Sequence, residues 1–184
     1  SGTVKGCTGI TDYFKTGFIA PLWVDASVIV NPDGRYSFHS ADQPFSIESH
    51  FPGQYAGFQG YTHMKFVLPW HVEESTGVKF LLQRPMWTEN ANPLYINKFT
   101  SAGGVIDFNS QHSLHLHTFL EIPNEKQEFI MPLGLPMLHI IPLTDKDITI
   151  KTHVLSQDEW DKRTIQSTGA KTYLKPTRTR KIME

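Results

Sequence analysis

The chain is short of cysteine, and this shortage excludes two kinds of structure. Cys7 is the only cysteine among the 184 residues, so no disulfide can form within the chain and no thiolate cluster can hold a metal. A single cysteine also fits a reducing compartment, in which thiols stay reduced. Candidate metal ligands must therefore come from histidine and carboxylate side chains.

Long hydrophobic runs are also missing. No apolar stretch approaches the roughly 20 residues that span a bilayer, and no signal-peptide pattern opens the chain. Charged residues make up only 19% and hydrophobic residues 39%. Such a composition is ordinary for a globular protein and excludes wholesale disorder. We expect a soluble protein without a membrane partner.

Positive charge is scarce until the end of the chain. The last 23 residues hold seven basic side chains and one acidic one, which leaves ten basic and seventeen acidic side chains in the first 161 residues. The basic residues are Lys162, Arg163, Lys171, Lys175, Arg178, Arg180 and Lys181. A basic tail on an acidic body can dock on its own domain, on a neighbouring subunit or on a polyanion. We expect a solvated or subunit-docking tail rather than a nucleic-acid contact.

Short apolar or alternating segments between turn signals predict about ten strands. The candidates are residues 23–30, 35–39, 63–68, 77–83, 94–99, 104–108, 113–122, 128–131, 136–141 and 148–155. Asn-Pro-Asp-Gly at 31–34 predicts a hairpin turn, and 40–61 reads as a long loop rich in aromatics. The first 17 residues contain at most one helical turn, around residues 11–15. A sandwich, jelly roll or closed barrel fits this pattern.

One helix is well signalled, near the end of the chain. Ser156 and Glu159 form a capping box, in which each side chain pairs with the backbone N–H of the other. Gly169 would end this helix. We predict one β domain over residues 1–155, followed by a short helix and the basic tail over 156–184.

Histidines suggest a metal site. Alternate residues of a strand share a face, so His115 and His117 project together. Glu121 has the same parity, and Pro-Leu-Gly at 132–134 precedes His139. This order resembles the cupin arrangement, which implies iron or zinc held by His115, His117, Glu121 and His139 in a metal-dependent enzyme. The same histidines also fit a strand whose polar residues face solvent or another subunit, with no cofactor bound.

A second resemblance involves the segments GGVID (103–107) and IMPLGLPMLHII (130–141). They resemble the latter half of dUTPase and dCTP deaminase domains (the β-clip barrel), in which the matching Asp107 would be the general base. Ser110 stands where that family has its base-stacking aromatic, and QRPM (83–86) replaces its phosphate-binding segment. We therefore expect binding rather than catalysis at this place. The candidate ligand-binding residues are Arg84, Gly104 and Asp107.

A third resemblance covers about residues 3–143. The strings TVKGCTGITDYFKTGFIAPLWVD, MKFVLPW, GGVID and GLPMLHIIPL appear in the order found in uncharacterised proteins of tailed phages of marine bacteria. It implies a non-catalytic binding, accessory or assembly module on a jelly-roll or dUTPase-like barrel. The expected partners are a second copy of the chain, or a phage or host protein. The expected location is the cytoplasm of an infected bacterial host or the virion.

Overall fold

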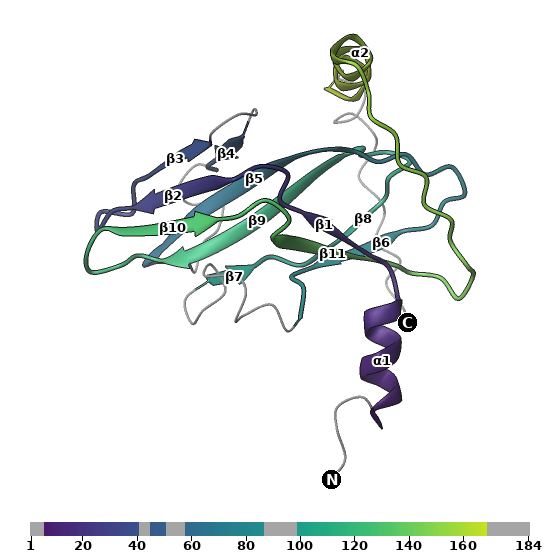
Figure 1. Ribbon diagram of the computed structural model, residues 1–184, viewed down its shortest axis with the longest axis horizontal. Helices are drawn as coiled ribbons and strands as arrows, with labels where there is room; N and C mark the ends of the chain where they lie inside the picture. Colours follow the sequence, from purple (N-terminus) through teal and green to yellow (C-terminus); the bar gives the residue numbers. More distant parts are fainter. Residues whose placement is uncertain (1–5, 41–44, 51–57, 87–98, 169–184) are drawn as a thin grey trace, which may run out of the picture.

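The protein is mainly β, as the sequence predicts. The computed structural model describes residues 6–40, 45–50, 58–86 and 99–168. In this part the chain forms three antiparallel sheets and two helices, α1 (Thr8–Lys15) and α2 (Gln157–Thr168). Figure 1 shows the sheets gathered into one β body from which the two helices extend on opposite sides.

The strands pair in three groups. The first sheet has the order β1 (Phe18–Pro21), β11 (Pro136–Pro142), β6 (Phe80–Gln83), β8 (Gly104–Ile106). The second sheet has the order β10 (Gln127–Met131), β2 (Ala26–Val30), β3 (Tyr36–Ser40). The third sheet has the order β4 (Ser46–Glu48), β5 (Tyr61–His71), β9 (Ser113–Glu121), β7 (Phe99–Ser101). These described strands do not close into a barrel, so that part of the predicted architecture is not observed.

Alternation along β5 and β9 separates the core-facing side of the third sheet from its outer face. The core-facing residues of the two strands are Thr62, Met64, Phe66, Leu68, Leu114, Leu116, Thr118 and Leu120, all of which are buried. Fully burying one large apolar side chain contributes about 1.5–3 kcal/mol, so this face fixes the register of the pair. The intervening residues, which include His63, His115 and His117, point to the opposite face.

The predicted hairpin at residues 31–34 is confirmed. β2 pairs with β3, and the turn closes with the Gly34 N–H donating to the Asn31 carbonyl at 2.9 Å. Gly34 has φ 79°, a conformation that strongly favours glycine. The Thr62 hydroxyl donates to the Gly34 carbonyl at 2.8 Å and so ties the hairpin to β5.

Two predictions along the chain need correction. The segment 40–61 was expected to be a loop, yet it contains β4, whose Ile47 is buried together with the preceding Phe45. Residues 148–155 were expected to form a strand, but they form none, because no strand of the described part lies beside them to complete a ladder. The candidate strand at 94–99 falls almost wholly outside the described residues, and β7 begins at its last residue.

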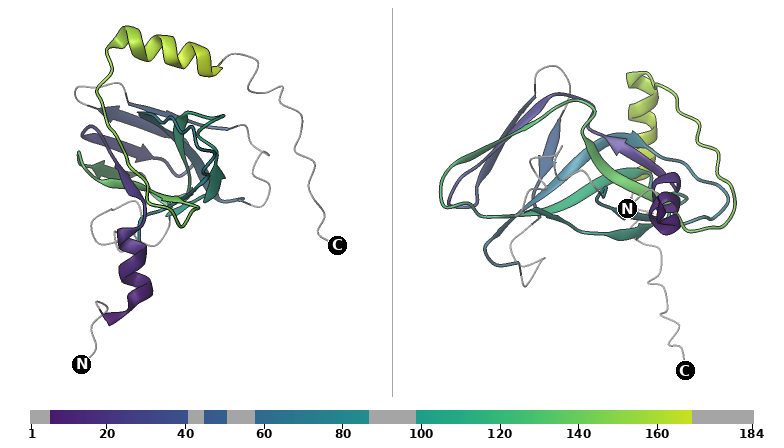
Figure 2. Two further views of the ribbon diagram at one scale, coloured as in Figure 1. Left: turned by 90° about the vertical axis from the view of Figure 1, so that its right-hand side faces the viewer. Right: turned by 60° about the horizontal axis from the view of Figure 1, so that its bottom comes forward.

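A glycine follows the end of α1, and a capping box begins α2. α1 is longer than the predicted single turn and is followed by Gly17, where φ is 78° and a Cβ atom would lie 2.1 Å from the Ile140 carbonyl oxygen. The capping box of α2 is confirmed, since the Ser156 N–H donates to Glu159 Oε2 at 2.9 Å. Figure 2 shows both helices from two further directions. Neither described helix has the length and apolar character that crossing a lipid bilayer requires.

Two described side chains of α2, Trp160 and Arg163, contact residues in or next to β5. The Trp160 ring lies edge-on to His71 with centroids 6.5 Å apart, and Arg163 forms an ion pair with Glu73. Gly169, the predicted end of this helix, and most of the basic tail lie outside the described residues.

Candidate metal site

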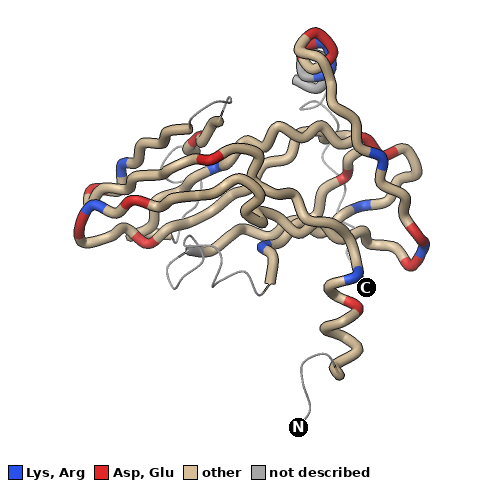
Figure 3. The backbone as a smooth tube through the Cα atoms, viewed as in Figure 1, with Lys and Arg blue, Asp and Glu red and all other residues tan. Residues whose placement is uncertain are grey.

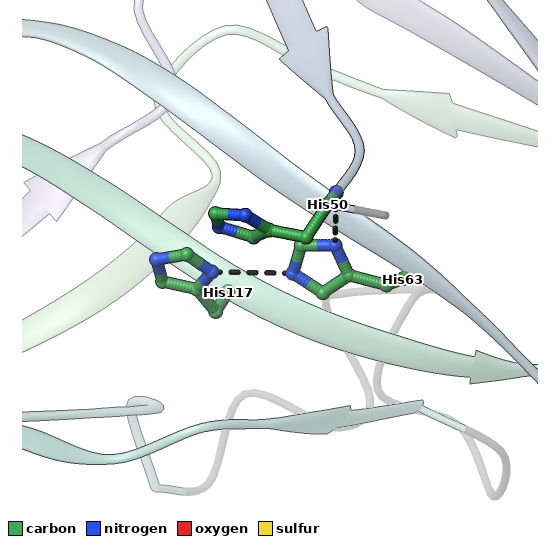
Figure 4. Close-up of side chains that lie close together, drawn as sticks. All are labelled: His50, His63 and His117. Carbon is green, nitrogen blue, oxygen red and sulfur yellow. Dashed lines mark hydrogen bonds between the residues drawn. The ribbon is translucent and has the colours of Figure 1, made fainter. Parts of the chain in front are cut away.

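Three histidines from separate segments meet on the outer face of the third sheet. His50 follows β4, His63 belongs to β5, and His117 belongs to β9. Each offers one ring nitrogen, and the three nitrogens lie within 4.8 Å of one another. We call these residues the tri-histidine cluster; Figure 4 shows their rings side by side above the two strands.

Strand register explains the meeting. β4, β5 and β9 are neighbours, with Glu48 opposite Lys65 and Lys65 opposite His117. His63 is two residues before Lys65 and lies opposite Phe119, so it shares the outer face with His117. His50 stands two residues beyond Glu48, and its ring reaches over this face to stack on His117 with centroids 5.3 Å apart.

Hydrogen bonds orient the rings. The His50 backbone N–H donates to His63 Nδ1 at 3.2 Å, and His63 Nε2 lies 3.1 Å from His117 Nδ1. Because His63 Nδ1 accepts, the proton of a neutral His63 must sit on Nε2, from which it is donated to His117. His117 Nδ1 therefore presents a lone pair, and one proton holds the two rings together.

All the shifts in pKa around this cluster favour neutral imidazole. Burial, reinforced by His117, His50 and Lys65, lowers the pKa of His63 to about 4. Burial, with His50 and Lys65, also lowers the pKa of His117. Neutral imidazole is the form that ligates metal ions.

An ion pair balances the charge beside the cluster. Lys65 Nζ lies 2.5 Å from Glu48 Oε2, and the Lys65 side chain is 17% exposed. The hydrogen bond from Lys65 lowers the pKa of Glu48. This carboxylate is therefore ionised and paired with Lys65.

A small pocket adjoins the cluster. It has a volume of about 140 Å³ and touches both His115 and His117. Its other lining residues are Leu82, Gly104, Val105, Ile106 and Gln111. Burial lowers the pKa of His115 to about 4, and its buried Nδ1 has no hydrogen-bond partner in the described structure.

Residues of the cupin-like hypothesis are only partly brought together. His115 and His117 share one face of β9, as predicted. Glu121 is exposed at the far end of that strand, opposite Tyr61. His139 is buried in β11, where its Nε2 lies 2.7 Å from the Thr16 carbonyl and its ring meets Tyr13 edge-on. His117 is therefore grouped with His50 and His63 rather than with Glu121 and His139.

Residues of the dUTPase-like hypothesis lie in or directly after β6 and β8. Gly104 lines the pocket. Asp107 begins a turn, in which its Oδ1 accepts the Asn109 N–H at 3.1 Å and its carbonyl accepts the Ser110 N–H at 3.0 Å. Arg84 is exposed just beyond the end of β6.

Sequence reasoning missed His50 and His63. His63 carried a usable signal, because it alternates with buried residues in a strand predicted over 63–68. His50 carried none, since it stands in a segment read as a loop and joins the cluster only through the pairing of β4 with β5.

Comparisons with known proteins add no family. No protein-family model, no curated protein and no solved structure matches the chain.

Proposed function

We propose that this protein binds a divalent transition metal, zinc or iron, through His50, His63 and His117. The observation that carries this proposal is the convergence of three ring nitrogens within 4.8 Å from three segments of the third sheet. Imidazole is a good ligand for zinc and iron, and three histidines leave a coordination position open.

The spacing of the nitrogens suits such an ion. Two nitrogens bound to tetrahedral zinc at about 2.0–2.1 Å lie about 3.3 Å apart. His63 Nε2 and His117 Nδ1 are 3.1 Å apart, so an ion would replace the proton between them with little movement of the strands.

Metal binding must also disturb a second hydrogen bond. A neutral His63 that ligates through Nε2 carries its proton on Nδ1, where it now accepts the His50 N–H. The two protons would then face each other, so the His50 backbone has to turn away. We expect the His50 amide resonance to shift more on metal addition than the amides of β5 and β9.

Binding rather than turnover is the proposed role. The carboxylate beside the cluster, Glu48, is paired with Lys65. Glu121, the acid that the cupin-like hypothesis would use, stands at the exposed end of β9.

Metal analysis tests the proposal. Protein stripped with a chelator is titrated with Zn²⁺ and Co²⁺ by calorimetry, and we expect one ion per chain. His63→Ala and His117→Ala should each lower the affinity at least about tenfold, since losing even a hydrogen-bond partner of a metal ligand costs about 10–100-fold. The control is His39→Ala, which removes an exposed histidine from β3. Equal affinity in all three variants would rule out the site.

The finer architecture and the biological setting stay predictions. Support for a jelly-roll or dUTPase-like relation comes from the GGVID segment, part of which forms β8, and from the apolar strand β11. Incubation with dUTP and dCTP tests the relation at the level of activity, where turnover lost in Asp107→Asn would favour it. The phage resemblance supports an accessory or assembly role, which mass spectrometry of purified particles would test.

A further inference from the structure

Residues 148–154 have the sequence of a strand without the structure of one. We call this segment the strap; it reads Ile-Thr-Ile-Lys-Thr-His-Val and is rich in β-branched residues. Its alternate apolar side chains are open to solvent, with Ile150 49% and Val154 98% exposed. Within the described structure its backbone N–H and C=O groups make no hydrogen bond. The strap therefore has strand-forming residues but no neighbouring strand in the described structure.

β10 has a neighbour on only one side among the residues that the structure describes. It is an edge strand of the second sheet and pairs only with β2 among the described strands. Its side chains alternate, with Phe129 packed against the core and Met131 fully buried, while Glu128 and Ile130 are exposed. A five-residue edge with an exposed isoleucine is a template for pairing with another chain.

We propose that the strap of one copy adds to β10 of a second copy as an antiparallel strand. Antiparallel pairing matches every strand pair of the described structure and is slightly more stable per residue than parallel pairing. In the register that places Lys151 opposite Glu128, Ile150 faces Phe129 and Ile148 faces Met131. The isoleucines then extend the apolar side of the second sheet, and the lysine meets the glutamate on its outer side.

Placement of the two segments favours a second copy over closure within one chain. Figure 1 shows the strap, between β11 and α2, at the opposite end of the β body from β10. The strap is anchored at both ends, because Leu143 N–H donates to the Lys79 carbonyl and Trp160 rests on His71.

Symmetry and charge fit the same partner. Each copy carries both a strap and an open edge, so a two-fold dimer makes the contact twice and closes. Figure 3 shows both acidic and basic residues in each of the two regions, so neither repels its counterpart as a block of one sign.

Light scattering during gel filtration tests the proposal over about 1–300 µM, a range that covers the weak affinities of small interfaces. We expect a monomer–dimer equilibrium. Ile150→Asp should raise the dissociation constant at least about tenfold, because it places a charge against Phe129 in both contacts. The control is Val105→Asp, which makes the same kind of change at a residue 60% exposed on β8 and should leave the equilibrium unchanged.

A charge swap tests the register. Lys151→Glu and Glu128→Lys should each weaken the dimer by about tenfold, since like charges then face each other twice, and the double variant should restore it. A monomer at every concentration, or a dimer that Ile150→Asp and the single charge reversals leave unchanged, would overturn the proposal. A dimer weakened by the single variants but not restored by the double variant would overturn the register.

Discussion

Acidification should destabilise the metal-free protein because several imidazoles are held neutral in the folded state. The pKa of His63 and that of His115 are each lowered to about 4, with burial as the main cause. An unfolded chain takes up these protons near pH 6.5, whereas the folded protein resists until about pH 4. The unfolded state therefore binds more protons in this window, and stability falls as the pH falls.

The size of the effect follows from the same values. Between pH 7.5 and 5 each group would contribute about 2 kcal/mol if fully shielded. Both side chains are only partly buried, so solvent screening reduces the contribution to about 1 kcal/mol each. We expect the free energy of unfolding to drop by about 2 kcal/mol over this range.

Urea unfolding followed by tryptophan fluorescence, with a chelator present, measures this drop. The double variant His63→Gln, His115→Gln cannot take up these protons and should lose about 2 kcal/mol less between the two pH values. An equal loss in the variant and the parent protein would refute the reasoning, because the loss would then come from other groups. The pKa values of glutamates such as Glu48 and Glu73 are also lowered, so these groups lose stabilising charge in more acidic solution. Keeping the pH at 5 or above limits their contribution to the measured drop in the free energy of unfolding.

Two further substitutions test the fold. Gly17→Ala should lower the free energy of unfolding by at least about 2 kcal/mol, since the residue has positive φ and its new Cβ would overlap the Ile140 carbonyl. Thermal unfolding checks this, and Gly9→Ala in α1, which meets nothing within 4 Å, is the control that should be neutral or stabilising. Ser156→Ala should destabilise α2 by about 1 kcal/mol through loss of the hydrogen bonds of the Ser156 hydroxyl with Glu159, and amide exchange in that helix should quicken while exchange in the core stays the same.

The fold was predictable where a strand buries one of its faces. In β5 and β9 mostly apolar core-facing residues alternate with residues of the outer face, and the chain pairs the two strands in the register that buries the core-facing set. The strap shows the opposite case. Its alternation is as clear, yet a strand also needs a partner, and partner availability is a property of the whole molecule. β4 was missed because its sequence signal is weak. It has only three residues, which pair with β5 and stand in a segment otherwise rich in turn-forming residues.

The candidate site was half predictable. Parity along one strand shows that His115 and His117 share a face, and the structure agrees. The actual neighbours of His117 are His50 and His63, which are 67 and 54 residues away in the sequence. Nothing in a single sequence specifies which strands pair across such distances, so the histidine set could not be assembled from spacing alone.

Anomalous diffraction from crystals grown with zinc tests the central claim most directly. The account predicts one strong peak at the zinc edge, bound by ring nitrogens of His50, His63 and His117 at about 2.0–2.1 Å, with the His50 N–H turned away from His63. The account would be contradicted if zinc fully occupied other sites in the crystal while the cluster showed no peak. His63 and His117 would then still lie within hydrogen-bond distance of each other.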